Sequence, residues 1–418
     1  MLSALDRLIR NLEQGHLETA MEDFSQLKNT GTDDEKFDAA EELFALGFLD
    51  ESRQLYEQLM DAYPDEKELV ILLAEVYTEM DQTEESLVLL ERITADNEFF
   101  PRAMLLSADI YQMQGLYEVS EQKLLQAKKQ LPDEPVIQFA LGELYNEQGR
   151  FLEAIRHYKQ INLPEMAGVN INRRLGECYS AGGSFEDALP YYESALEDER
   201  DVQTLFEYAF TAYQASHYQT ASSVFEELLE MDPEYHAAYL LLARAYEHDE
   251  ELEKALDAAE AGVKSDPFHK ELFLTAGKLS LKLGLEQKAE EFMRQAIALD
   301  PDYLEAALVL NRILIHQERA DEVLEVIEIV RNSGEDDPQF NWDAAKAYEW
   351  QEQYDQALEE YKKAYVVYND HTDFLADYGS FLLEEGRREE ARVIFEKLIK
   401  HDPSNEEWQM TLDSLSQF

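Results

Sequence analysis

Residues 135–168 read PVIQFALGELYNEQGRFLEAIRHYKQINLPEMAG, and they are one copy of a unit that recurs along the chain. The recurrence is clearest at one position, mostly a small residue, in the second half of each unit. Successive copies of this position are almost evenly spaced: Ser52, Ser86, Ser120, Ala154, Ala188, Ala221, Ala255, Ala289, Val323, Ala357 and Ala391. A period of about 34 residues indicates stacked supersecondary units that share an extended core.

Each unit contains two apolar-periodic stretches of similar length, joined by a short polar or Gly-containing link. In the quoted copy the link is Gln148-Gly149-Arg150. The pattern predicts a helical hairpin, in which small residues let the two helices approach and aromatic rings fill the space beside them. Prolines, often in an Asp-Pro pair, close several units where a helix must end: Pro64, Pro132, Pro233, Pro267, Pro301 and Pro403.

The composition supports a long apolar core in a highly charged chain. Of the 418 residues, 45% are hydrophobic and 30% are charged. Asp and Glu number 90 against 36 Lys and Arg, so the formal net charge is −54. Nucleic acids and anionic lipids bind cationic surfaces, and we therefore expect no nucleic-acid partner.

The first residues, MLSALDRLIRNLEQGHLETAM, carry charges within their apolar spacing, which predicts an amphipathic helix and not a signal peptide. The longest uncharged apolar run, about Leu69 to Ala74, is too short to cross a bilayer. The single cysteine, Cys178, excludes an intrachain disulfide framework and fits a reducing compartment. We expect a cytoplasmic protein without membrane insertion.

The spacing Leu141-Gly142-Tyr145-Gly149-Phe151-Ala154-Tyr158 resembles the tetratricopeptide repeat (TPR), and the resemblance extends over residues 1–403. It implies an all-α, right-handed superhelical solenoid of about twelve TPR helical hairpins, with a C-terminal capping helix at 404–418. The units of this continuous array start near residues 1, 33, 67, 101, 135, 169, 202, 236, 270, 304, 338 and 372. Asn311 departs from the pattern, because a small residue is usual at that position. The length, the acidity and the lack of another domain are similar to the YpiA-type repeat proteins of Gram-positive bacteria.

Signatures of catalysis do not occur in the sequence: GxxxxGK[ST], GxSxG, HExxH and paired CxxC motifs are all absent. The nine His residues are scattered among different units without metal-ligand spacing. We therefore predict a protein that is not an enzyme, with no catalytic residues, no cofactor and no metal site. Cys178 is predicted to be a buried thiol.

In TPR arrays the first helix of each unit lines the concave face with positions 2, 5, 9 and 12, which share one side of a helix. Position 9 changes its charge along this chain, from five acids through one aromatic residue to four bases: Glu41, Glu75, Asp109, Glu143, Glu177, Phe210, Arg244, Lys278, Arg312, Lys346 and Ser380. Four successive bases at one position are more than this acidic composition predicts.

Aromatic residues accompany this ladder. Trp342, Lys346 and Trp350 follow one another at helical spacing on one predicted helix, and Trp and basic residues are frequent interface anchors. Position 5 adds an aromatic stripe at Phe37, Phe139, Phe206 and Trp342. The predicted partner-binding residues are Arg244, Lys278, Arg312, Lys346, Trp342, Trp350, Phe206, Phe210, Glu75, Asp109 and Glu143.

Two interpretations of the ladder stay open. In the structural one, its Lys and Arg residues pair with acids on adjacent helices and relieve the self-repulsion of the chain. The functional one predicts a non-enzymatic scaffold or adaptor that binds partner proteins or peptides in a concave groove, acidic in the N-terminal half and basic in the C-terminal half. The alternative function is a self-associating assembly protein, a homodimer whose complementary halves pair head-to-tail.

Overall fold

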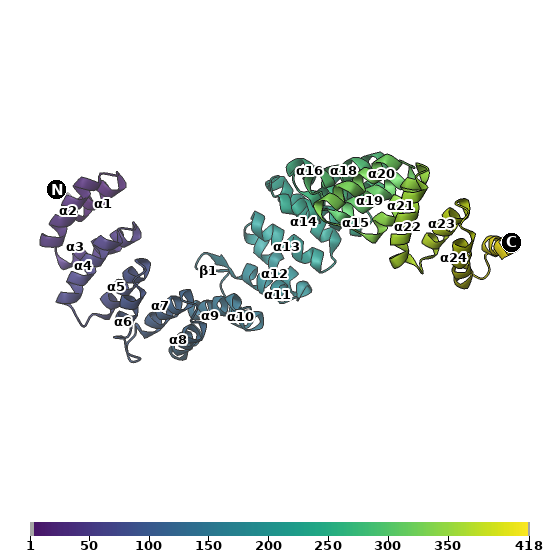
Figure 1. The fold of residues 1–418 in the computed structure, drawn as a ribbon. Coiled ribbons are helices and arrows are strands. Elements are labelled where there is room, and N and C mark those ends of the chain that lie inside the picture. The colour runs from purple at the N-terminus through teal and green to yellow at the C-terminus, as the bar shows by residue number, and fades with distance from the viewer. Residues whose placement is uncertain (1–3, 417–418) are drawn as a thin grey trace. The chain divides into compact units, whose positions relative to one another are not determined.

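The computed structural model describes residues 4–416, and its regular structure is helical except for two short strands (Figure 1). Within that range, twelve consecutive helix pairs are followed by one capping helix, so the predicted all-α hairpin fold is confirmed. The first helices of the pairs are α1 (Ala4–Glu13), α3 (Asp33–Ala45), α5 (Lys67–Glu79), α7 (Phe100–Met113), α9 (Pro135–Glu147), α11 (Ile171–Ala181), α13 (Val202–Gln214), α15 (His236–His248), α17 (Lys270–Lys282), α19 (Leu304–His316), α21 (Pro338–Trp350) and α23 (Thr372–Glu384).

The second helices complete the hairpins, and two of them, α6 and α10, are shorter than the others. They are α2 (Leu17–Thr30), α4 (Leu49–Ala62), α6 (Thr83–Leu90), α8 (Tyr117–Gln130), α10 (Phe151–Tyr158), α12 (Phe185–Asp198), α14 (Tyr218–Met231), α16 (Leu252–Ser265), α18 (Glu286–Leu299), α20 (Ala320–Ser333), α22 (Tyr354–Tyr368) and α24 (Arg388–His401). The capping helix α25 (Glu406–Ser416) packs Trp408, Leu412 and Leu415 on the last buried cluster, which includes Leu398 of α24.

The helices form two compact parts, Met1–Arg200 (the N-terminal part) and Asp201–Phe418 (the C-terminal part). Each part repeats the same hairpin, and each is described by itself below. That residues 1–403 act as one continuous array stays a prediction. No helix in the described range is both long enough and apolar enough to cross a membrane.

Every hairpin turns through one residue in the left-handed region, at position 15 of the unit. The values of φ at this position range from +54° at Glu318 to +81° at Gly47. Seven of the twelve residues are Gly, which adopts this conformation without strain, and five carry a side chain: Gly15, Gly47, Asp81, Gly115, Gly149, Gly183, Ser216, Glu250, Gly284, Glu318, Glu352 and Gly386.

Small residues hold the paired helices together, as the repeat predicts. Ser52 and Ser86 are fully buried at position 20, and each donates a hydrogen bond of 2.8 Å to the carbonyl of position 8, Ala40 and Ala74 respectively. Asn311 takes position 8 in the pair α19–α20. Its side chain is fully buried, and neither its amide nitrogen nor its oxygen has a hydrogen-bond partner among the described residues. This pair therefore contains a polar defect in the core.

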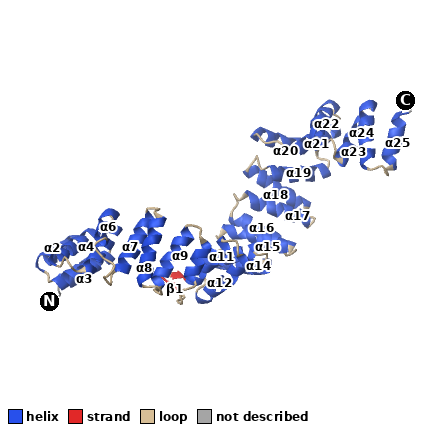
Figure 2. Cartoon of the chain, turned by 90° about the horizontal axis from the view of Figure 1, so that it is seen from below, coloured by secondary structure: helices blue, strands red, loops and turns tan. Residues whose placement is uncertain are grey.

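A small β-hairpin interrupts the helical pattern between α10 and α11 (Figure 2). Strands β1 (Glu165–Met166) and β2 (Val169–Asn170) pair antiparallel, with Met166 opposite Val169. The turn residues Ala167 and Gly168 have φ values of +52° and +78°, the conformation of a tight hairpin turn. The hairpin follows the early end of α10 at Tyr158, and α11 starts at Ile171, which Asn170 caps, in place of the expected Val169.

Candidate functional site

Hollows open on the side of the first helices that carries positions 2, 5, 9 and 12, which we call the first-helix face, and three of them are lined by described residues. One lies in the N-terminal part, between α7, α8, α9 and the β-hairpin, and has a volume of about 620 Å³. Two lie in the C-terminal part: the Arg244 hollow on α15, α17 and α19, of about 510 Å³, and the Arg312 hollow on α19, α21 and α23, of about 540 Å³. The four positions supply half of the lining of the N-terminal hollow and most of the lining of the other two.

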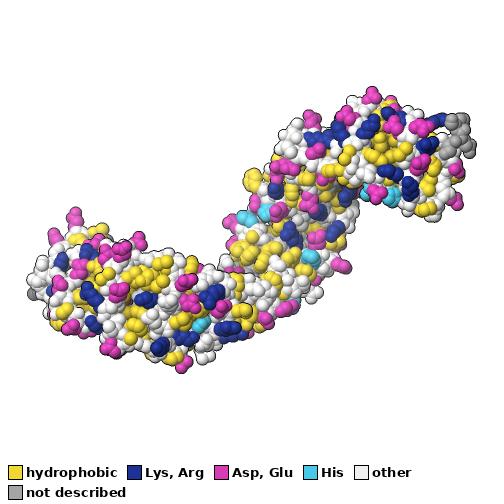
Figure 3. Space-filling view, turned by 60° about the horizontal axis from the view of Figure 1, so that its bottom comes forward, with side chains coloured by type: hydrophobic (Ala, Val, Ile, Leu, Met, Phe, Trp, Pro, Cys, Tyr) yellow, Lys and Arg dark blue, Asp and Glu magenta, His cyan; other side chains and the backbone are white. Residues whose placement is uncertain are grey.

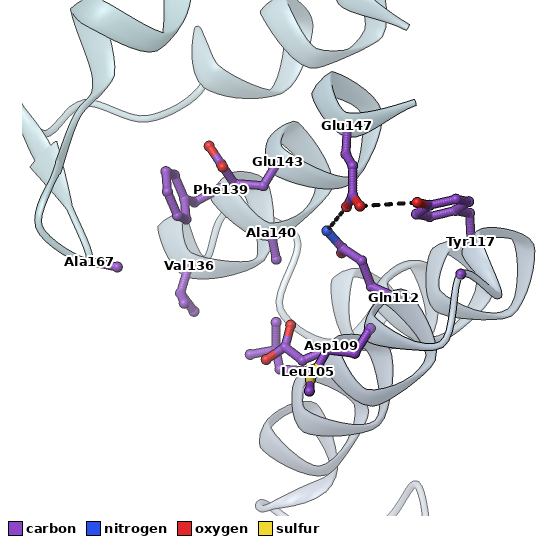
Figure 4. Close-up of a pocket in the computed structure, with 12 residues that line it drawn as sticks. Leu105, Asp109, Gln112, Tyr117, Val136, Phe139, Ala140, Glu143, Glu147 and Ala167 are labelled. Atoms are coloured by element: carbon purple, nitrogen blue, oxygen red, sulfur yellow. Dashed lines mark hydrogen bonds between the residues drawn. The ribbon is translucent and has the colours of Figure 1, made fainter. Parts of the chain in front are cut away.

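The N-terminal hollow has apolar walls. Figure 4 shows Val136 and Ala140 of α9 pointing toward the side of α7 that carries Leu105 and Asp109, with the hairpin residue Ala167 at one edge. Met113 and Val136 are exposed although they are apolar. The hollow therefore offers uncovered apolar surface to a ligand.

Polar side chains close one side of this hollow. Glu147 accepts hydrogen bonds from the amide of Gln112 and, at 3.0 Å, from the hydroxyl of Tyr117 (Figure 4). These contacts join α7, α8 and α9 and hold the wall in place.

Asp109, like Glu41, is a ladder acid that stays free. It makes no hydrogen bond or ion pair within residues 4–416, and its side chain reaches water through the mouth of the hollow. Neighbouring protein atoms partly desolvate this carboxylate, which raises the pKa of Asp109 to about 6. The carboxylate is nevertheless exposed at the mouth of the hollow, and it lacks a counter-ion within the described residues.

The two other predicted acids are already engaged. Arg102 donates to Glu75 at 2.7 Å. Glu143 accepts a hydrogen bond of 2.6 Å from the hydroxyl of Tyr158 and forms an ion pair of 3.0 Å with Arg174. Glu75 and Glu143 therefore offer less charge to a ligand than the sequence suggests.

The Arg244 hollow is strongly charged. Lys278 forms an ion pair with Glu305, whereas Arg244 is exposed and forms none within the described residues. Glu247 lines the same hollow and pairs with Lys282 at 2.8 Å. One ladder base of this hollow is thus neutralised and the other is available.

The Arg312 hollow combines charge with an aromatic wall. Asp377 accepts hydrogen bonds of 3.0 Å from both the indole nitrogen of Trp342 and the ammonium of Lys346. The Trp342 ring also packs edge-on against Phe374, at 5.3 Å between ring centres. Arg312 is exposed and has no ion pair in the range 4–416.

A buried carboxyl lies in the same hollow. Asp343 is 7% exposed and accepts a hydrogen bond of 2.9 Å from Gln339. The amide of Asn311 faces it without the geometry of a hydrogen bond. Burial raises the pKa of Asp343 to about 6, although Gln339, Asn311 and the two nearby cations favour the charged form.

Two rungs of the ladder pair with the next unit in the same way. Glu75 pairs with Arg102 and Lys278 pairs with Glu305, so in both cases a residue at position 9 meets an opposite charge at position 2 of the next unit. After Asp109 that position holds Val136, and after Arg312 it holds Gln339, so neither finds a counter-ion there. The sequence pattern did not single out Arg102 and Glu305. An opposite charge at position 2 of the next unit is only part of the signal, because Glu271 holds that position after Arg244, which forms no ion pair within the described residues.

The remaining predicted residues lie outside the three hollows. Trp350, which is 36% exposed, does not line the Arg312 hollow beside Trp342 and Lys346. Phe206 and Phe210 are half-buried and stack on each other with ring centres 6.3 Å apart. Whether these three residues bind a partner stays a prediction.

The structure contains little that suggests catalysis. Among the described residues, no group of three or more His, Cys, Asp or Glu could hold a metal ion. Cys178 is buried, its thiol donates to the side-chain oxygen of Asn146 at 3.3 Å, and burial raises its pKa to about 12.

Over the face shown in Figure 3, basic and acidic side chains are interspersed.

Comparisons with known proteins agree with this architecture. The family described as "YpiA-like, tetratricopeptide repeats" matches residues 112–165, and "YpiA-like, C-terminal tetratricopeptide repeats" matches residues 338–405. More general tetratricopeptide-repeat families match residues 32–110, 211–270 and 281–347.

Two solved structures are similar to parts of this chain. YrrB, described as a TPR protein with an unusual peptide-binding site, is 16% identical and covers 44% of this chain and 96% of its own, with a TM-score of 0.39. The C-terminal part of a TPR repeat-containing protein from Cytophaga hutchinsonii is 18% identical and covers 56% of this chain and 97% of its own, with a TM-score of 0.48.

A sequence relative is far more similar. The TPR repeat-containing protein YpiA of Bacillus subtilis (strain 168) is 40% identical over 414 residues, which are 99% of this chain and 98% of the relative. Similarity of this degree over the whole length of both chains, together with the two YpiA-like matches, shows that the chain belongs to the YpiA-like family of tetratricopeptide-repeat proteins.

Proposed function

We propose that this protein is a non-enzymatic scaffold of the cytoplasm, which binds partner proteins or peptides on its first-helix face. TPR proteins bind proteins and peptides, and the fold offers a long surface in place of one deep active site. In this proposal the N-terminal part binds basic segments and the C-terminal part binds acidic ones.

The observation that carries the proposal is the arrangement of the four ladder bases. Arg244 and Lys278 line one hollow, and Arg312 and Lys346 line the next. Lys278 and Lys346 are paired within the fold, which supports the structural interpretation for those two residues. Arg244 and Arg312 are exposed and unpaired within the described residues, which supports a role in binding.

A double charge reversal tests the proposal. A fluorescein-labelled peptide of alternating Glu and Leu residues should bind the full chain, and Arg244→Glu with Arg312→Glu should abolish that binding. The matched control is Lys264→Glu with Lys362→Glu, which changes the charge equally at exposed, unpaired positions of the second helices α16 and α22. Equal loss of binding in both double variants would show that the ladder bases affect binding only through the net charge of the chain.

Self-association is the second candidate function. The unpaired Asp109 of the N-terminal part is opposite in charge to the unpaired Arg244 and Arg312 of the C-terminal part. A dimer held by these charges should dissociate as the salt concentration rises, because exposed ion pairs are screened. Sedimentation velocity at low and high salt would detect this, and a monomer at all concentrations would rule it out.

A further inference from the structure

We propose that the N-terminal hollow binds a segment of a partner protein in which a large aliphatic or aromatic side chain neighbours a Lys or Arg. This inference rests on the proposed scaffold function and assigns a ligand chemistry to one of its surfaces. It draws on the shape, the walls and the charge of the hollow.

The hollow has the size and the walls of a side-chain pocket. Its volume of about 620 Å³ lies within the range of pockets that bury small ligands, about 300–1,000 Å³. Leu105, Val136, Phe139 and Ala140 give it an apolar interior, and Met113, 69% exposed, extends that surface to the rim. Covering such surface with an apolar side chain releases water and stabilises a complex.

The β-hairpin makes this hollow different from the others. Neither hollow of the C-terminal part has a β-hairpin residue in its wall, whereas here the turn residue Ala167 lies at one edge. The turn brings main chain and a methyl group to the rim. This edge limits how far a bound side chain can extend along α9.

The charge of the hollow selects a cation beside the apolar group. Asp109 has no counter-ion within the described residues, because Val136 occupies the position from which Arg102 reaches Glu75 in the preceding unit. Two guanidinium groups of the N-terminal part are committed elsewhere, since Arg102 pairs with Glu75 and Arg174 pairs with Glu143 and Glu177. A Lys or Arg of a ligand would supply the missing partner, in a partly exposed ion pair beside the apolar walls.

Two substitutions test this chemistry while leaving the core untouched. Asp109→Asn removes the charge and keeps the shape. Val136→Arg places a guanidinium at the position relative to Asp109 that Arg102 holds relative to Glu75, so the chain itself would neutralise Asp109 and fill the hollow. Glu41→Gln is the matched control, an exposed acid at the same position of another unit. Circular dichroism melting curves should show that all three variants fold.

The probe is a library of short random peptides displayed on phage and panned against the full chain. The enriched peptides should carry a large apolar residue within two positions of Lys or Arg. A synthetic copy of an enriched peptide should bind Asp109→Asn about fivefold more weakly than it binds the native chain, since a partly exposed ion pair contributes modestly to the binding free energy. It should bind Val136→Arg more than about tenfold more weakly. Glu41→Gln should bind it as the native chain does.

The outcomes separate this inference from the scaffold function on which it rests. If peptides are enriched but bind Asp109→Asn and Val136→Arg with native affinity, the inference is wrong and the scaffold function stands. The inference is equally wrong if every enriched peptide is acidic. It is also wrong if Asp109→Asn and Val136→Arg disrupt a dimer of this chain but leave peptide binding unchanged. If no peptide is enriched, both proposals fail.

Discussion

Gly142 of α9 lies directly against the ring of Tyr158 of α10, so closely that a Cβ at Gly142 would stand 2.4 Å from Cε1 of the ring. The ring is fully buried, and its hydroxyl donates to Glu143 on the rim of the N-terminal hollow. Other pairs combine Ala with Tyr at the same two positions, Ala40 with Tyr56 and Ala345 with Tyr361. Gly142 therefore allows an unusually close approach of helices that shape the hollow.

We expect Gly142→Ala to destabilise the N-terminal part by about 1–3 kcal/mol, because a buried aromatic ring must move to admit the methyl group. Gly277 is the comparison: an added Cβ would meet the terminal methyl of Met293, a flexible side chain that can turn away. Gly277→Ala should be neutral or stabilising, since Ala favours a helix over Gly by about 1 kcal/mol. Urea unfolding followed by circular dichroism measures both, and equal effects would contradict this account.

Glu352 should be a position at which Gly stabilises the protein. Its φ of +58° is unfavourable for any residue with a side chain, and seven of the other hairpins have Gly there. We expect Glu352→Gly to raise the free energy of unfolding of the C-terminal part by about 1 kcal/mol. All three Trp residues, Trp342, Trp350 and Trp408, lie in that part, so Trp fluorescence during unfolding reports on it.

Glu352→Ala is the control for that prediction. It removes the same charge and keeps the strained conformation, so it should stabilise the protein less than Glu352→Gly does. If the two variants are equally stable, the effect comes from charge and not from the backbone.

Asp343 should make the C-terminal part less stable as the pH rises from about 4 to 6. Its pKa rises from 3.8, the ordinary value, to about 6 in the fold, so between these values the folded chain holds a proton that the unfolded chain has lost. The free energy of unfolding therefore falls with increasing pH over this range. Asp343→Asn should remove this dependence and add up to about 3 kcal/mol of stability at neutral pH.

Unfolding of both chains in urea, followed by Trp fluorescence at several pH values, measures this. Asp373→Asn is a suitable control, because Asp373 lines the same hollow but is exposed. If the free energy of unfolding changes with pH in the same way in the native chain and in Asp343→Asn, the buried carboxyl has no such effect.

The unpaired and the paired bases of the Arg312 hollow should differ in their effect on ligand binding. We expect Arg312→Gln to weaken binding of the acidic peptide more than Lys346→Gln does. Lys346 must first give up its contact with Asp377 before it can bind the peptide. Fluorescence anisotropy at about 50 mM and about 300 mM salt should show the difference shrinking as exposed charges are screened. A larger loss for Lys346→Gln would mean that Asp377 releases its partner when the peptide binds.

Much of the fold follows from the sequence alone. The period of the repeat predicted the helix pairs, because a small residue at a fixed position of each stretch dictates where two helices can touch. Asp33, Lys67 and Pro338 begin helices at the expected residues. The helical period also predicted which positions share the first-helix face, since that depends only on rotation along one helix.

The pairing of charges on that face needed the tertiary structure. Whether Lys346 pairs with Asp377, or Arg312 forms no ion pair within the described residues, depends on how one hairpin stacks on the next and on side-chain rotamers, which a local period does not encode. The β-hairpin at Ala167 also lay outside the repeat pattern, in the segment between α10 and α11. The sequence determined which residues share a face because helix geometry is local, and only the stacking of neighbouring units decided which of their charges are left for a partner.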